Sequence, residues 1–312
     1  MVFSSIFFLF HFLPLFFLVY HVTPQKFRNY VILLASLFFY SWGAPAFVFV
    51  LTGAIIINFF VVQKLFRTDK AYPRKVLLVW SLVLNLGLLA YFKYANFFVD
   101  NVNHLLSVFG TGQIEWIRVA LPIGISFFTF QSITYSVDVY RKIHAPFEKL
   151  SNYMLYIISF PQMIAGPIVR YREIADEIIH REERIDDKLI GFYRFIIGLA
   201  KKVLIANVMA EQAEQIFSQM DGLSAASAWI GMLAYTMQIY FDFSGYSDMA
   251  IGLGKMMGLH FPENFNSPYI SKSITEFWRR WHITLGTFMK EYLYIPLGGN
   301  RVTRSRLFFN LC

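Results

Sequence analysis

The sequence predicts an all-α protein that crosses a membrane several times. Of its 312 residues, 56% are hydrophobic and only 15% are charged, whereas a soluble domain is about a quarter charged. The apolar residues also form long runs separated by short polar connections, which is the pattern of transmembrane helices. Together these observations exclude an ordinary soluble globular domain.

The net charge of +8 does not indicate nucleic-acid binding. The Lys and Arg residues lie in short connections between apolar runs, without the aromatic-studded surface that RNA binding needs. We therefore expect no nucleic-acid partner. The single cysteine, Cys312, allows neither a disulfide framework nor a thiolate site, and no His pair has metal-ligand spacing, so no metal is expected.

The first hundred residues contain four predicted helices. Residues 1–22 lack a basic leader and a small-residue cleavage site, so we interpret them as the first span. Residues 30–62 are too long for one straight span and are broken at positions 43–45, which predicts two helices. For residues 30–42, a tilted or partly interfacial helix is the alternative. Residues 76–99 form the next predicted span.

The middle of the chain contains interrupted apolar segments. Residues 117–139 are predicted to span, with Pro122 and Gly124 loosening the helix. Residues 151–169 are broken by two prolines and a glycine, which favours a re-entrant element over a Pro-kinked helix. Residues 170–188 are strongly charged, and we interpret them as a cytoplasmic segment with a short amphipathic helix.

Two further spans follow. Residues 189–209 carry Lys201 and Lys202 near their middle, so the lysines either extend to the interface or lie in a protein-lined cavity. Residues 224–257 form a long apolar helix that is interrupted by the polar sequence YFDFSGYSDMAIGLG. The last residues, RLFFNLC, resemble the opening turns of another membrane helix, so we expect an incomplete domain.

The distribution of Lys and Arg predicts the orientation. The connections at 100–116 and 211–222 contain acids but no Lys or Arg, and the positive-inside rule places them outside. The N-terminus is then extracytoplasmic, and residues 273–301 lie at or near the cytoplasmic face. The basic connections, assigned to the cytoplasm, are residues 26–28, 64–75, 141–149 and 170–188.

Residues 273–301 are the predicted reaction-centre helix and loop. Within residues 274–285 they combine an acid, two arginines, a histidine and two tryptophans in an otherwise apolar protein. A helix over residues 274–285 would place Trp278, Trp281 and Leu285 on one face. A histidine among aromatic residues is more often a packing residue than a catalyst, so this pattern alone does not make His282 catalytic.

Asp242 and Asp248 interrupt the apolar run of residues 224–257. An ionisable group inside a membrane costs roughly 3 kcal/mol on insertion scales, so such groups usually face a cavity or a partner. They are therefore candidate site residues. The alternative is that Asp242 pairs with Lys201, Lys202 or an arginine merely to hold helices together.

Four segments provide a comparison with known families: FPQMIAGPIVRY, YFDFSGYSDMAIGLGKMMG, FPENFNSPY and SITEFWRRWHITLGTFMKEYLYIPLGGNR. Together they resemble the membrane-bound O-acyltransferase family, in its bacterial branch that acetylates alginate and other exopolysaccharides. The likeness covers residues 1–312 as a single, incomplete domain. It implies a ring of helices with re-entrant elements around a thin waist, where a cytoplasmic acyl donor meets an extracytoplasmic hydroxyl.

His282 matches the first of the two functional histidines of that family. The second, which is usually assigned as the active-site residue, lies in a Trp-His pair on the helix that follows the GGNR loop. No residue after that loop in this sequence matches it, so the resemblance implies that the 312 residues alone are inactive. The resemblance also implies a location in the bacterial inner membrane. We expect His282 to be catalytic, by orienting the acyl donor or by steadying the charge that develops on its carbonyl oxygen. Supporting or substrate-binding roles are expected for Asp242, Asp248, Glu276, Trp278, Arg279, Trp281 and Asn300. Among these, Asp242 or Asp248 is expected to position a histidine.

The expected chemistry is transfer of an acetyl group to polysaccharide hydroxyls, with an imidazole as the base. The expected donor is acetyl-CoA or another acetyl thioester on the cytoplasmic side, with no bound cofactor. Membrane lipid, the polysaccharide acceptor and periplasmic acetylation proteins are the expected partners. D-alanyl transfer to teichoic acid, a polysaccharide or lipid transporter, and a catalytically dead translation product are the alternatives.

Overall fold

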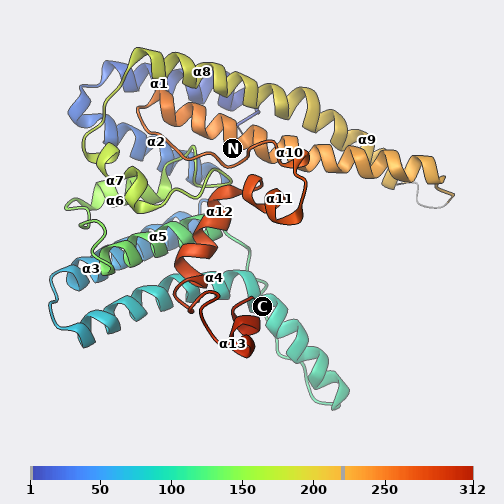
Figure 1. Ribbon diagram of the computed structural model, residues 1–312, viewed down its shortest axis with the longest axis horizontal. Helices are drawn as coiled ribbons and strands as arrows, with labels where there is room; N and C mark the ends of the chain where they lie inside the picture. Colours follow the sequence, from blue (N-terminus) through green and yellow to red (C-terminus); the bar gives the residue numbers. More distant parts are fainter. Residues whose placement is uncertain (1–2, 219–221, 312) are drawn as a thin grey trace.

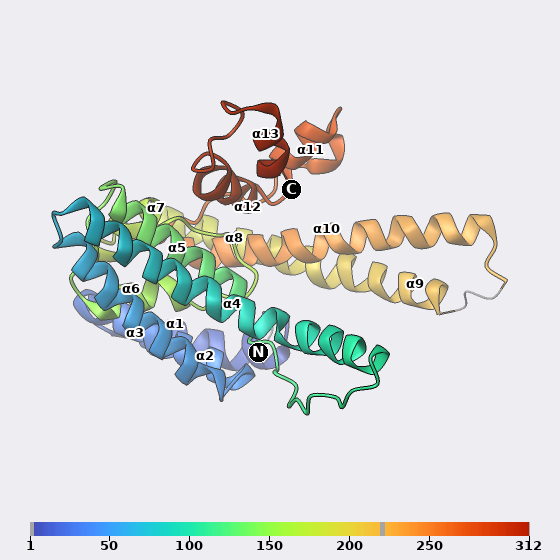
Figure 2. The same cartoon turned by 90° about the horizontal axis from the view of Figure 1, so that it is seen from below.

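The computed structural model describes residues 3–218 and 222–311 (Figure 1). Every regular element in these residues is a helix, which confirms the all-α prediction. Helices α1 to α7 form one bundle, while α8, α9 and α10 form a long antiparallel arm beside it (Figures 1 and 2). The segment with α11, α12 and α13 lies along one flank of the bundle (Figure 2).

The predicted break at positions 43–45 is confirmed. Helix α2 (Arg28–Gly43) ends there and α3 (Phe47–Phe66) begins four residues later. The first predicted span contains the π-helical turn η1 (Phe8–Phe12), which runs directly into α1 (Leu13–Val22), and a short turn, η2 (Gln25–Phe27), leads into α2.

The next two helices differ from their predicted limits. Helix α4 (Ala71–Val108) is longer than the predicted 76–99. Helix α5 (Ile125–Tyr140) begins eight residues later than the predicted 117. The reason is Gly124, which has a left-handed φ of 76°. A right-handed helix cannot continue through this conformation, and only glycine fits here, because a Cβ would clash with the backbone carbonyl of Met163.

The segment over residues 151–169 does not continue as a kinked helix. Helix α6 (Leu150–Ile158) stops after nine residues, and turns follow until α7 (Tyr171–Ile179). Phe160 holds the break in the core, because its side chain is fully buried and its N–H donates to Ser36 Oγ at 3.0 Å. Helix α7 is the predicted short amphipathic helix, with Ile174 and Ile178 buried.

The polar sequence within residues 224–257 does not interrupt that helix, contrary to the prediction. Helix α10 (Ala225–Met256) is continuous and packs against α8 (Ile185–Ala200), the π-helical turn η3 (Lys201–Ala206) and α9 (Asn207–Phe217). Two glycine pairs allow this close approach: a Cβ at Gly198 would lie 2.6 Å from the Gly245 oxygen, and one at Gly252 would lie 2.6 Å from the Gly191 oxygen.

The predicted helix over residues 274–285 is two helices. Helix α11 (Ile274–Arg280) ends at Trp281, and α12 (Ile283–Phe288) begins after His282. The other elements of this flank are η4 (Pro268–Ile270), the π-helical turn η5 (Met289–Tyr294) and α13 (Arg304–Leu311).

Two helices in the described part of the chain, α3 and α4, are long and apolar enough to cross a membrane. Helices α2 and α5 have 16 residues each, short of the about 20 that a straight crossing needs, so several crossings stay a prediction. The basic connections nevertheless gather at one end of the molecule, at the left in Figure 2. The connection 109–124 and the far ends of α9 and α10 lie at the opposite end.

Candidate active site around His282

Helix α11 begins with a reciprocal cap. Ser273 Oγ accepts the Glu276 N–H at 3.1 Å, and Glu276 Oε2 accepts the Lys272 N–H at 3.0 Å. The other oxygen of Glu276 accepts Arg280 Nε at 3.0 Å. Two hydrogen bonds hold the pKa of Glu276 below its usual value: the larger effect comes from the Lys272 backbone and the smaller one from Arg280. Glu276 does not contact His282 in the described residues. Its carboxylate stabilises the start of α11.

The break between α11 and α12 falls on His282 itself. Its backbone is left-handed, with φ 45° and ψ 52°, a conformation that residues other than glycine adopt rarely. The Ile283 N–H donates to the Asn264 carbonyl at 3.0 Å, which fixes the turn. The chain therefore changes direction at the one residue that the sequence singles out for chemistry.

Asn264 holds the His282 ring. The side-chain oxygen of this fully buried residue lies 2.9 Å from His282 Nδ1, 2.9 Å from Thr284 Oγ1 and 3.4 Å from the Thr284 backbone nitrogen. A backbone N–H can only donate, so the atom that faces it is the amide oxygen. His282 Nδ1 must then carry a hydrogen, which leaves Nε2 of the neutral ring as an unprotonated acceptor.

Thr284 joins this arrangement to the broken segment after α6. Its Oγ1 donates to Asn264 and accepts the Ile168 N–H at 3.0 Å. The site therefore combines three stretches of chain: the segment before α7, the loop that follows α10, and the α11–α12 turn. These stretches contain three of the segments that carry the family resemblance.

Aromatic side chains enclose the half-buried imidazole. The ring of Phe243, on α10, meets His282 edge to face at 4.9 Å, and Trp281 packs against Phe265 and Phe277 at 5.1 and 5.6 Å. Burial among these groups lowers the pKa of His282 to about 4. The imidazole is therefore neutral at pH 7 and can accept a proton or a hydrogen bond at Nε2.

Neither Asp242 nor Asp248 contacts His282 in the described residues. Asp248 pairs with Lys201 at 2.6 Å and Arg194 at 2.8 Å, and Asp242 pairs with Lys202 at 2.6 Å. These contacts tie α8 and η3 to α10, as the alternative interpretation proposed for Asp242. Asn264, two residues before a second asparagine in FPENFNSPY, performs the expected positioning instead.

The other predicted site residues lie apart from the ring. Trp278 is 61% exposed. Arg279 is exposed and has no ion pair within the described residues. Asn300 is exposed after the left-handed Gly298 and Gly299. The described residues place none of these three side chains in contact with His282.

A second polar cluster anchors the stretch that follows α12. Glu291 Oε2 pairs with Arg170 at 2.6 Å and with Arg172 at 2.7 Å, while the Tyr292 hydroxyl donates to Asp138 at 2.8 Å. Our reading of the sequence missed these residues, although Arg170, Glu291 and Tyr292 lie within or next to the quoted motifs. In residues 3–218 and 222–311, no group of three or more His, Cys, Asp or Glu side chains is arranged to hold a metal ion.

Comparison with known proteins gives consistent matches. The model of the membrane-bound O-acyltransferase family matches residues 126–311. The chain is 45% identical, over its whole length, to a probable alginate O-acetylase of Pseudomonas aeruginosa, of which it covers 60%. It is 38% identical over its whole length to a peptidoglycan O-acetyltransferase of Helicobacter pylori, of which it covers 64%. It is 30% identical, over 70% of its length, to a teichoic acid D-alanyltransferase of Bacillus subtilis, of which it covers 59%.

Proposed function

Since this chain belongs to the membrane-bound O-acyltransferase family, we propose that the whole protein transfers acetyl groups to hydroxyls of an extracytoplasmic polysaccharide such as alginate. The observation that carries this proposal is the contact of Asn264 with His282, which leaves an unprotonated nitrogen, Nε2, on a neutral imidazole. Acyl transfer to a hydroxyl is accelerated by a group that takes the hydroxyl proton, and an unprotonated imidazole nitrogen can accept it.

In the proposed step, the acceptor oxygen attacks the carbonyl carbon of an acetyl thioester while its proton moves to His282 Nε2. An ester bond forms and the carbon–sulfur bond breaks. Because the pKa of His282 is about 4 and that of an ordinary thiol is about 8.5, the proton then passes favourably from Nε2 to the departing thiolate. The imidazole is returned to its neutral form, and no resident cofactor takes part.

The tautomer with its hydrogen on Nδ1 argues against a second possible role of His282, that of stabilising the carbonyl oxygen. Stabilising the negative charge that develops on the carbonyl oxygen needs a hydrogen-bond donor. The one N–H of neutral His282 is already given to Asn264. We therefore propose that another group supplies that donor, and that His282 acts as acceptor and base.

The substrates and surroundings are part of the same proposal. Acetyl-CoA or a related thioester is the cytoplasmic donor, and periplasmic acetylation proteins and membrane lipid are partners. The protein crosses the bacterial inner membrane several times with its N-terminus outside. The identity of 45% to an alginate O-acetylase, against 30% to a D-alanyltransferase, favours acetyl over D-alanyl transfer.

The test uses a full-length version of the protein in a strain that lacks the gene. We expect His282→Ala and His282→Gln to leave membrane abundance near normal and to lower incorporation of labelled acetate into polysaccharide by at least about tenfold. His104→Gln, at an exposed histidine of α4, is the matched control and should retain activity. Normal activity per inserted molecule in both His282 variants would assign the α11–α12 turn to folding and not to the reaction.

The length of chain needed for transfer can be tested in the same strain. The 312 residues span 60% of the Pseudomonas relative, and the resemblance implies a second histidine that no position here matches. We propose that residues 1–312 alone do not sustain acetylation. Restored polymer acetylation by this form would refute that.

A further inference from the structure

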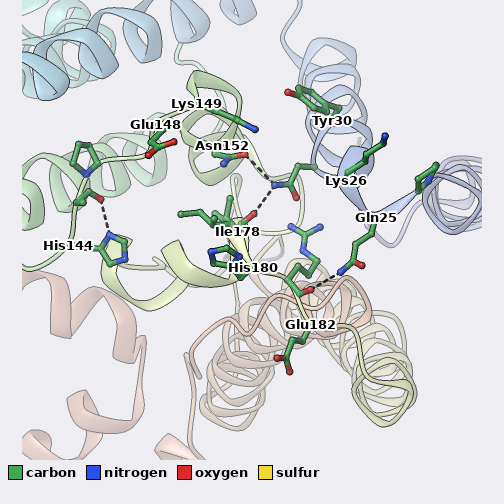
Figure 3. A pocket seen from close by; sticks show the side chains of 16 residues that line it. Gln25, Lys26, Tyr30, His144, Glu148, Lys149, Asn152, Ile178, His180 and Glu182 are labelled. Atoms are coloured by element: carbon green, nitrogen blue, oxygen red, sulfur yellow. Dashed lines mark hydrogen bonds between the residues drawn. The ribbon is translucent and has the colours of Figure 1, made fainter.

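A wide groove opens at the end of the molecule that carries the basic connections (Figure 3). Its volume is about 1200 Å³. Three connections that are distant in the sequence build it: α1–α2, with Gln25 and Lys26; α5–α6, with Glu148 and Lys149; and α7–α8, with His180. None of its lining residues belongs to the His282 site, so the groove is a separate feature.

The groove carries more positive than negative charge. Lys26 and Lys149 are exposed, and neither has a carboxylate partner in the described part of the chain. His144 pairs with Asp176 at 3.1 Å. Of the two acidic residues that line the groove, Glu182 pairs with Arg184 at 3.1 Å, which leaves Glu148 as the acid that can oppose the lysines.

Arg181 is a buried cation in the wall of this groove. It is only 8% exposed, and its Nη1 donates to the Tyr20 hydroxyl at 3.3 Å. Its Nε and Nη2 have no hydrogen-bond partner in the structure as described. Gln25 fixes the backbone from across the groove by donating to the Arg181 carbonyl at 3.0 Å.

The carboxylate of Glu183, two residues after Arg181, is already engaged. Glu183 pairs with Arg28 at 2.5 Å and with Lys188 at 2.8 Å. Two cations and the Tyr20 hydroxyl thus share this carboxylate, and within the described residues Arg181 reaches it only through that hydroxyl, without a direct ion pair. A buried charge without a counter-charge costs several kcal/mol, so an anion bound in the groove would offset that cost.

The remaining lining is partly apolar. Tyr30 and Ile179 line the groove and are 45% and 46% exposed. A ligand that combines an anionic group with an apolar stem would satisfy both parts. Guanidinium and ammonium groups together favour phosphate, which offers several acceptor oxygens to fixed and mobile donors at once.

We propose that this groove binds a phosphate group, carried by an anionic phospholipid head or by a soluble phosphate ester. Arg181 supplies a fixed positive charge from the buried wall of the groove, and Lys26 and Lys149 supply mobile donors from the two other connections. The phospholipid form fits the predicted cytoplasmic position of all three connections, because that leaflet carries anionic lipid.

The experiment measures the thermal unfolding midpoint of the full-length protein in neutral detergent. One arm titrates inorganic phosphate at constant ionic strength, and the other titrates phosphatidylglycerol diluted in phosphatidylcholine. We expect a saturable rise of the midpoint in at least one arm. A response to both probes means that the phosphate group suffices, and a response to phosphatidylglycerol alone means that the lipid is required.

Variants locate the binding. The surface double variant Lys26→Gln/Lys149→Gln should weaken the apparent affinity at least about tenfold, whereas Glu148→Gln should strengthen it. Arg181→Gln should abolish binding if it folds. The matched control, Lys64→Gln/Lys70→Gln, removes the same charge from a neighbouring basic connection outside the groove and should bind like the unmodified protein. Equal weakening in both double variants, or no saturable response in either arm, would overturn the proposal.

Discussion

At the residue scale, the two nitrogens of His282 face different surroundings. Nδ1 lies against the Asn264 amide, and that amide is fixed in turn by Thr284. An asparagine carries no charge, so it orients the ring without favouring the protonated form, whereas an aspartate would raise the pKa. The contact with Asn264 therefore orients the His282 imidazole and leaves it neutral.

The low pKa of His282 predicts a pH dependence of stability. It is about 4 in the folded protein, against 6.5 for an ordinary histidine. Between pH 4 and pH 6.5 the unfolded chain binds a proton at this histidine that the folded chain does not. His282 therefore lowers the stability of the folded protein as pH falls from 6.5 towards 4, and it does not change the stability above pH 6.5. The unfolding midpoint of the unmodified protein should thus fall more steeply in that window than that of His282→Gln.

The control for this measurement is His104→Gln, which should keep the full pH dependence of the unmodified protein. A difference between the unmodified protein and His282→Gln that stays constant from about pH 7.5 to pH 4 would contradict the low pKa.

Asp248 predicts a loss of stability without a loss of chemistry. Asp248→Asn removes the carboxylate that Lys201 and Arg194 share, and we expect a cost of about 1 to 3 kcal/mol, less than for a fully buried pair. Asp242→Asn, at a carboxylate that is 47% exposed, should cost under about 1 kcal/mol. Activity per folded molecule should be unchanged in both. Normal stability with lost acetylation would instead place Asp248 in the reaction.

At the element scale, α8 and α10 approach each other through glycine. Gly191 and Gly198 lie seven residues apart on one helix, facing Gly252 and Gly245, also seven apart, on the other. The close approach brings the lysines of η3 within reach of the aspartates of α10, so backbone contact and ion pairing depend on one another.

Gly198→Ala should therefore destabilise the protein by about 1 to 3 kcal/mol, because the new methyl group must displace the backbone of α10. Gly87→Ala is the matched control on α4, where nothing lies within 4 Å of the added Cβ, and it should be neutral or stabilising by up to about 1 kcal/mol. Chemical denaturation of both variants measures the difference. Equal effects would mean that α8 and α10 are not in close backbone contact.

Glycine and proline predict some helix limits but not all, since Gly124 was expected only to loosen a helix that in fact begins after it. The break after Gly43 follows from local backbone chemistry and is confirmed. The break at His282 is not predictable in this way, because its left-handed backbone is held by Asn264, 18 residues earlier, rather than by local preference. The Asn264 contact was missed for the same reason, since one sequence does not show which distant residues meet. The seven-residue glycine spacing in both helices was a usable signal for the contact between α8 and α10.

At the scale of the whole molecule, the connections separate by charge. Those rich in Lys and Arg lie at one end and the connection 109–124 lies at the other, although the sequence assigned them to sides one at a time (Figure 2). The groove shown in Figure 3 forms because three of these basic connections lie side by side at that end.

This separation predicts the result of labelling with a membrane-impermeant thiol reagent. Residues 101–116 should be extracytoplasmic and residues 173–187 cytoplasmic. In a Cys312→Ser background, Gly112→Cys should react in intact spheroplasts, whereas Asp186→Cys should react only after lysis. The Cys312→Ser protein alone should give no signal. Labelling of both positions from the same side would overturn the topology.

The amide oxygen that holds His282 also decides where protons can travel. An amide does not accept a proton at neutral pH, so the path that enters the ring at Nε2 ends at Asn264. Any proton that the imidazole takes up must leave through the same nitrogen. Held in this way, the ring cannot pass a proton onward through Nδ1.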